Sequence, residues 1–177
     1  IKIMPSGGVL SIGDNPDEQL MADDEITAVV QTAHSLGLKV AAHAHGKEAI
    51  DKAVTLGVDS IEHGSFADAE SYKLMKAHGT YLVPTLLVGD TAMKIARAHP
   101  EQLNPSSAAK ALKVGPILLK NLGDAYHAGV KIAFGTDSGV SAHGDNAREF
   151  ALLVRAGLTP LQAIQSATVG AAEHLRI

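Results

Sequence analysis

The sequence predicts an α/β fold that forms the C-terminal portion, about strands 4 to 8, of a (β/α)8 TIM-type barrel. Short apolar runs alternate with helical segments along the 177 residues, which is the pattern of parallel βα units. Five such runs are present, whereas a closed barrel needs eight. The chain also opens on Ile1, already inside a strand. We therefore expect residues 1–177 to be a partial barrel domain of a larger protein.

In the first half of the chain, acidic residues and glycines mark where helices begin and end. The run from Asp23 to Glu25 places negative charge in the first turn of a helix, and Gly37 and Gly57 stop the first two helices. The elements expected here are a strand at 1–4, a helix at 23–36, a strand at 39–42, a helix at 47–56 and a strand at 58–61.

The second half continues the same alternation, with one interruption. We expect a helix at 68–77, a strand at 81–83, an irregular excursion at 89–105, a strand at 130–134 and helices at 146–156 and 161–175. A long helix that Ser106 or Ser107 caps should run to about His127 before the last strand.

Composition excludes several functional classes. The 15 basic and 19 acidic residues give a net charge of -4 without a basic stripe, so nucleic acid is not an expected partner. No run approaches the roughly 20 apolar residues of a membrane helix. With no cysteine, any metal must be held by histidine, carboxylate or modified lysine. We expect a cytoplasmic protein, although this composition also fits the periplasm or secretion.

Four polar residues lie at or just past the ends of predicted strands: Lys2, His43, His63 and Asp137. The carboxyl ends of parallel strands share one face, so these side chains should meet. Each has an ordinary structural alternative, such as a solvated lysine or a helix-capping aspartate. Their joint occurrence in successive strands indicates a metal site instead. His45 should point the same way as His43, and Glu62 should face away from the site.

The ordered strings extend this prediction. Together, IKIMPSGG, AAHAHG, GVDSIEHG, FGTDSG, HGDNAREF and TPLQAIQSAT resemble the second half of an amidohydrolase-superfamily barrel. They are most similar to the imidazolonepropionase-like branch, which contains Xaa-Pro dipeptidases (prolidases) and Xaa-Arg/Lys carboxypeptidases.

The resemblance implies a ligand set for two zinc ions. Lys2 would be carboxylated by carbon dioxide, and its carbamate would bridge the ions; His43, His63 and Asp137 would be the further ligands. Asp137 would also move the proton during catalysis, and His45 would hydrogen-bond the substrate carbonyl. The family's His-x-His pair and its β-sandwich segment have no counterpart here, so this chain alone lacks two expected ligands.

The implied activity is zinc-dependent hydrolysis of a C–N bond in dipeptides or short peptides, in which a metal-bridging hydroxide attacks and the C-terminal residue is released. HAHG and HGDN resemble members that prefer a basic C-terminal residue, which His143 or Asp145 would contact. One alternative is hydrolysis of a cyclic amide. Another is a non-catalytic metal-binding fragment whose open sheet edge pairs with a missing segment or a second copy, giving a homo-oligomer.

Overall fold

The computed structural model describes all residues 1–177 and contains one parallel sheet. Its five strands lie side by side in sequence order, so each strand pairs with the next along the chain. They are β1 (Lys2–Ile3), β2 (Ala41–Ala44), β3 (Ser60–His63), β4 (Tyr81–Val83) and β5 (Lys131–Ile132). The predicted alternation of parallel strands with helices is confirmed.

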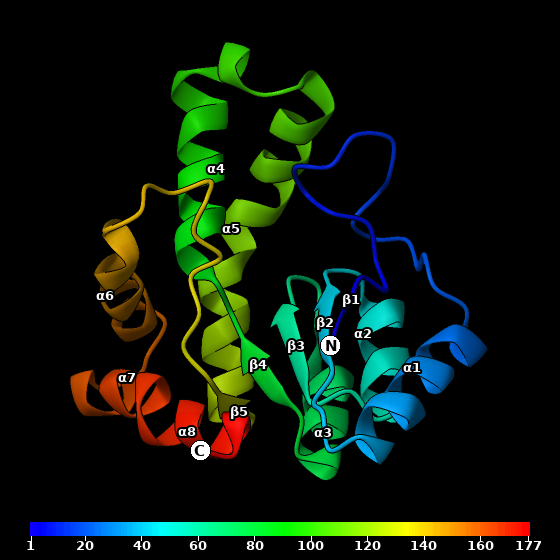
Figure 1. The fold of residues 1–177 in the computed structure, drawn as a ribbon. Helices are drawn as coiled ribbons and strands as arrows, with labels where there is room; N and C mark the ends of the chain where they lie inside the picture. Colours follow the sequence, from blue (N-terminus) through cyan, green and yellow to red (C-terminus); the bar gives the residue numbers. More distant parts are fainter.

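Helices occupy most of the remaining chain, as Figure 1 shows. The α-helices are α1 (Asp23–Ser35), α2 (Lys47–Thr55), α3 (Ala69–His78), α4 (Leu86–Ala98), α5 (Pro105–His127), α6 (Arg148–Arg155), α7 (Pro160–Ala167) and α8 (Val169–Leu175). Two short 3-10 helices, η1 (Pro100–Gln102) and η2 (Asp145–Ala147), join α4 to α5 and lead into α6. None of these helices is long and apolar enough to span a membrane.

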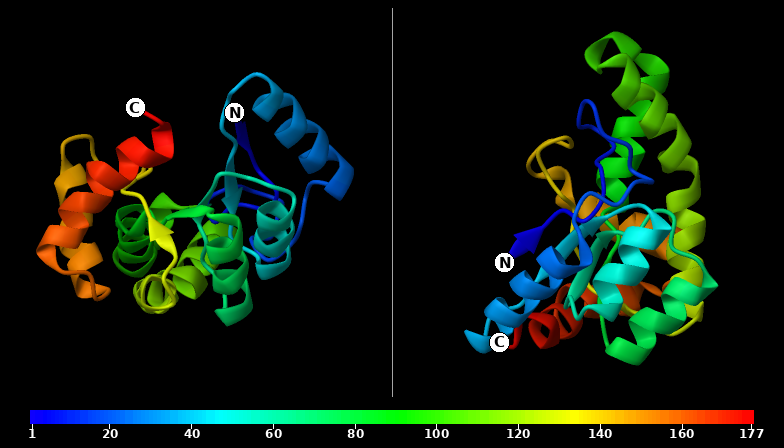
Figure 2. Two further views of the ribbon diagram at one scale, coloured as in Figure 1. Left: turned by 90° about the horizontal axis from the view of Figure 1, so that it is seen from below. Right: turned by 90° about the vertical axis from the view of Figure 1, so that its right-hand side faces the viewer.

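The helices form three groups around the sheet. The helices α1 to α3 follow β1 to β3, α4 and α5 form a long antiparallel pair beside β4, and α6 to α8 gather near β5 (Figures 1 and 2). Their apolar faces enclose one main core, in which Ile26, Ile50, Ile61, Leu87 and Leu122 are buried. This core fixes the strands whose carboxyl ends carry the predicted site.

The segment expected to be irregular, residues 89–105, is mostly helical, so that prediction was wrong. Residues 86–98 form α4, which buries Leu87 and Ala96 beside α5. The polar stretch that begins at Gly89 favoured a loop, because glycine disfavours helices. Here it permits close packing, since a Cβ at this position would lie 2.0 Å from Cδ1 of Leu118.

Smaller differences concern element ends. The strands β2 and β3 each lie two residues later than expected. The single helix expected at 161–175 is divided at Thr168, whose backbone leaves the helical region and separates α7 from α8. Asn104, not Ser106 or Ser107, caps α5 by accepting a hydrogen bond from the Ser106 amide. The last strand is shorter than expected, because regular pairing with β4 ends at Ile132.

Candidate metal centre

Three imidazoles meet at the carboxyl ends of β2 and β3. His43 lies on β2, His45 directly follows it, and His63 ends β3. One ring nitrogen from each lies within 4.8 Å of the others. Nε2 of His63 and Nδ1 of His43 are 2.9 Å apart, and the ring of His45 stacks on that of His63. The predicted convergence of His43 and His63 is therefore present, with His45 beside them.

His63 reaches this cluster through an unusual backbone conformation. Strict alternation would place its side chain on the helix-covered face with Ile61, which is fully buried. A φ of 72° turns it back toward His43. Thr85 and Asp137 also have positive φ values, 46° and 49°. Positive φ is uncommon outside glycine and is typical of functional sites, and all three residues line one cavity.

Hydroxyl groups fix the orientation of two imidazoles. Nδ1 of His63 lies 2.6 Å from Oγ1 of Thr85, and Nδ1 of His45 lies 2.7 Å from Oγ of Ser65. The backbone amide of His45 also donates to Oγ of Ser6 at 2.8 Å. A hydrogen bond on one ring nitrogen fixes which nitrogen remains for a ligand, as is typical of metal-binding histidines.

Burial keeps these imidazoles neutral. It lowers the pKa of His43, with a smaller contribution from the positive charge of Lys2. Burial also lowers the pKa of His45 to about 3 and that of His63 well below its ordinary value. All three rings are therefore neutral at neutral pH and each keeps one nitrogen lone pair, which is the form that binds metal.

The cluster fits a bound zinc ion. Zinc takes imidazole nitrogens at about 2.0 to 2.1 Å in a tetrahedral arrangement, which places two ligand nitrogens about 3.3 Å apart. The 2.9 Å separation between the nitrogens of His63 and His43 is close to this value. A metal-binding imidazole must also be neutral and correctly oriented, and both conditions hold here. His43 and His63 are therefore suited to hold the ion.

The other two predicted ligands lie at the margins of the cluster. Asp137 is solvent-exposed but lines the same cavity, and its charge raises the pKa of His43 against the effect of burial. Lys2 is exposed on β1 and is not part of the cavity wall. Its charge nevertheless acts on His43 and His63, which places it near both.

Glu62 does not face away from the site, contrary to expectation. It pairs in register with His43, and paired residues of parallel strands share a face. The Ser60 hydroxyl donates to its carboxylate at 2.8 Å, and burial raises the pKa of Glu62. Alternation along the strand failed as a guide because His63, not Glu62, leaves the regular strand conformation.

Two residues of the loop after β5 that were expected to contact substrate lie apart from the cavity. His143 is exposed and lies outside the cavity wall, and Asp145 pairs with Arg148 at 3.2 Å. Asn146 has a role that sequence reasoning missed. Its side-chain amide donates to Oγ1 of Thr136 and Oγ of Ser138, the residues on either side of Asp137. It thereby fixes the backbone that presents Asp137.

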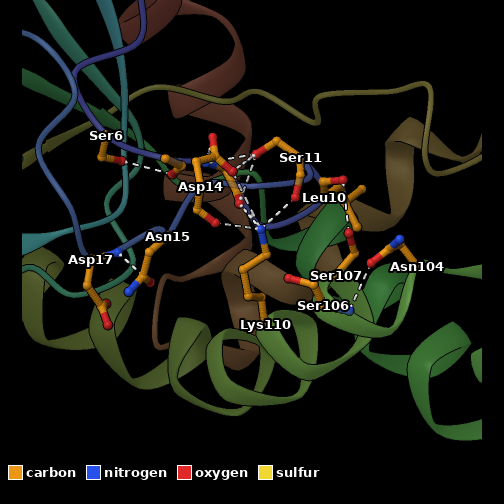
Figure 3. A network of polar contacts seen from close by, with 12 residues as sticks. Ser6, Leu10, Ser11, Asp14, Asn15, Asp17, Asn104, Ser106, Ser107 and Lys110 are labelled. Atoms are coloured by element: carbon orange, nitrogen blue, oxygen red, sulfur yellow. Dashed lines mark hydrogen bonds and ion pairs between the residues drawn. The ribbon is translucent and has the colours of Figure 1, made fainter.

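A cavity of about 500 Å³ lies over the imidazoles. One wall is apolar and comes from α4 and α5, including Val88, Val114 and Leu118. Another wall is the loop after β1, which Lys110 of α5 holds through the carbonyl oxygens of Gly8, Ser11 and Asp14 at 2.6 to 3.1 Å (Figure 3). The cavity therefore combines a polar floor with apolar sides.

The chain is similar to several known proteins. Over 172 residues the chain is 39% identical to an ochratoxinase of Aspergillus niger, covering 97% of this chain and 35% of that protein. A crystal structure of a Xaa-Pro dipeptidase with bound methionine superposes with a TM-score of 0.96 at 43% identity, covering 99% of this chain and 43% of the other. The crystal structure of the A. niger ochratoxinase gives a TM-score of 0.84 at 38% identity, covering 99% and 39%.

The chain thus spans less than half the length of these relatives. The predicted fold, a portion of a TIM-type barrel, is confirmed by these superpositions. The model of the amidohydrolase family matches residues 1–177, so the chain belongs to that family.

Proposed function

We propose that the protein hydrolyses the amide bond of dipeptides or short peptides and releases their C-terminal residue. The observation that carries this proposal is the cluster of three neutral imidazoles at the floor of a partly apolar cavity. The Xaa-Pro dipeptidase and the ochratoxinase to which the chain is similar give further support.

His43, His63 and Asp137 would hold zinc, and a carboxylated Lys2 would bridge two ions in the complete protein. Bound zinc makes a nucleophile available at neutral pH and polarises a carbonyl group. An unmodified lysine ammonium has no lone pair, so Lys2 requires the carbamate to serve as a ligand. Carbon dioxide is therefore part of the proposed cofactor set.

Two side chains would act directly on the substrate. Asp137 lines the cavity and is exposed, so it can accept a proton from water and return it to the leaving amine. Nδ1 of His45 is held by Ser65, which leaves its Nε2 to hydrogen-bond the substrate carbonyl. Substitution of His45 by asparagine should lower turnover without lowering metal content. A loss of metal would instead make His45 a ligand.

The cavity walls would determine which substrate side chains bind. Val88, Val114 and Leu118 offer apolar surface, and no acidic residue lies on the α4 and α5 part of the wall. Substrates with an apolar side chain should therefore be preferred over those with a basic C-terminal residue. His143 would contact substrate only if the loop after β5 moved toward the cavity, because it lies outside the cavity wall in this structure.

The test combines metal content with a substrate panel. The protein would be purified after growth with zinc and bicarbonate, and its metal content measured by elemental mass spectrometry. Dipeptides with apolar, proline and basic C-terminal residues would then be compared with a cyclic amide, such as a lactam or an imidazolone. About two metal ions per chain and dipeptide cleavage support the proposal. Metal without cleavage of any amide would leave a binding protein, and preferential ring opening would make it a cyclic amidohydrolase.

A further inference from the structure

Helix α4 begins without the usual hydrogen bond from its own N-cap side chain. A threonine at the N-cap normally accepts a hydrogen bond from an amide in the first turn of its helix. Thr85 occupies this position but makes no such bond, and its backbone is left-handed with a φ of 46°. Its Oγ1 instead lies 2.6 Å from Nδ1 of His63. The hydroxyl is thus directed away from the helix and toward the metal centre.

Glu149, more than sixty residues later in the chain, caps α4 instead. Its two carboxylate oxygens accept hydrogen bonds from the backbone amides of Leu86 at 2.9 Å and Leu87 at 2.6 Å. The side chain is completely buried at the start of α6. It therefore satisfies the amides that the Thr85 hydroxyl leaves without a partner.

A buried carboxylate is a costly way to cap a helix. Removing the charge from water is unfavourable, and only the two amides compensate for it here. Thr85 is also β-branched, and its left-handed backbone is a further cost. An ordinary threonine cap would avoid both costs. The observed arrangement ties α6 to α4 and, at the site, gains the contact between Thr85 and His63.

We propose that Glu149 is a positioning residue of the metal centre, which caps α4 so that the Thr85 hydroxyl can hold His63. In this arrangement Nδ1 of His63 would donate to Oγ1 of Thr85, which would leave Nε2 to bind the metal. Without the carboxylate, the amides of Leu86 and Leu87 would lack acceptors, and Thr85 would return to ordinary capping. His63 would then lose its partner. This inference rests on the proposed metal site, but it assigns a role to a residue outside it.

The test compares two variants, their combination and a control. Glu149→Gln keeps the size of the side chain but places an amide donor against one of the two backbone amides. Thr85→Val removes only the hydroxyl. The control is Asp68→Asn, because Asp68 caps α3 through the amides of Glu70 and Ser71 and does not line the cavity. Metal affinity is measured by competition with a chelator, and the His63 tautomer by nitrogen-15 NMR.

We expect Glu149→Gln and Thr85→Val each to weaken metal binding about 10- to 100-fold, the range for residues that orient a ligand. The double variant should lose no more than Thr85→Val alone, because both act through one contact. Both single variants should also broaden or shift the Nδ1–H signal of His63. Asp68→Asn should lower thermal stability and leave metal affinity unchanged.

Three results would overturn the inference. One is unchanged metal affinity in a folded Glu149→Gln protein, which would make Glu149 a helix cap only. Another is additive loss in the double variant. If Glu149→Gln does not fold, Glu149→Asp takes its place, because its shorter carboxylate cannot reach both amides. Unchanged metal affinity in Glu149→Asp would also refute the role. If the unaltered protein binds no metal, the proposed function fails instead, so the two failures are distinguishable.

Discussion

The middle of the sheet and its two margins present the candidate site in different ways. At the middle, hydroxyl groups of Thr85 and Ser65 hold the rings of His63 and His45. At the margins, Lys2 and Asp137 are exposed, and neither side chain makes a hydrogen bond within the chain. Their backbones are nevertheless held: Lys2 belongs to β1, which pairs with β2, and Asn146 bonds to Thr136 and Ser138 on either side of Asp137.

This difference indicates which parts of the site are preorganised. The imidazoles are neutral, partly or fully buried and oriented before any metal binds. Little reorganisation is then needed for the first ion, which favours binding. Lys2 and Asp137 retain freedom of movement, so their final positions would depend on the metal and on the carbamate. The histidines should therefore determine metal retention, and Asp137 should determine turnover.

The largest effect should follow from losing His63. We expect His63→Asn to weaken metal binding by more than about 100-fold, beyond the loss from residues that only orient a ligand, and to remove activity with it. Asparagine tolerates positive φ, so the backbone at this position should survive. Chelator competition gives the affinity. His78→Asn, an exposed histidine at the end of α3, is the control. Equal affinity in both variants would show that His63 is not a ligand.

The next largest effect should come from Asp137. Asp137→Asn should lower kcat about 100- to 10,000-fold, because asparagine cannot accept the proton. Its free energy of unfolding should change by less than about 0.5 kcal/mol, since the side chain is exposed. Dipeptide kinetics and chemical denaturation measure the two quantities. Asp124→Asn on α5 is the control, and a kcat as high as in that variant would remove Asp137 from the proposed mechanism.

The contrast between middle and margins also separates what the sequence could predict from what it could not. The histidine strings lie at the ends of apolar runs, so local pattern placed His43 and His63 together. Contacts between distant segments leave no such pattern. In the sequence, Thr85 is only the residue after Pro84, and Glu149 is one of several polar residues in a predicted helix. Their hydrogen bonds depend on how α4 and α6 pack, which periodicity does not reveal.

The same limit explains the errors in the fold. Gly89, Asp90 and Thr91 favour a loop by propensity, yet packing against α5 makes α4 helical. Glu62 was placed on the wrong face because alternation assumes a regular strand. That assumption fails at His63, where φ is 72°. The positive φ of His63 could be predicted only from a local preference for the left-handed backbone. The histidine itself and the following Gly64 indicate such a preference only weakly.

A third prediction concerns Glu149 and pH. Burial raises the pKa of Glu149 from 4.5 to about 7, and no charged side chain contributes. The folded chain therefore holds a proton that the unfolded chain releases between these values. The free energy of unfolding should fall by up to about 3 kcal/mol as pH rises through this window. Denaturation with a chelator present, at about pH 5 and about pH 8, measures this fall.

In Glu149→Gln this fall should be smaller, because glutamine does not titrate. Asp68→Asn should retain it, since the hydrogen bond from Lys47 lowers the pKa of Asp68 and places its titration below the window. A fall of the same size in Glu149→Gln and the unaltered chain would mean that other groups cause it. The cap of α4 would then not depend on the charge of Glu149 between these pH values.

The smallest effect tests the loop that forms one cavity wall. Lys110 is 11% exposed and donates to three carbonyl oxygens of the loop, whereas Lys113 makes an exposed ion pair with Asp17. Lys110→Met should lower the free energy of unfolding by about 1 to 2 kcal/mol, because three carbonyl oxygens, two of them partly buried, lose their charged donor. Lys113→Met should cost less than about 1 kcal/mol. Limited proteolysis of residues 7–15 should be faster only in Lys110→Met, since its loop loses the anchor. Equal proteolysis rates would mean that the loop is held by its own turns, and the cavity wall would then be as preorganised as the imidazoles.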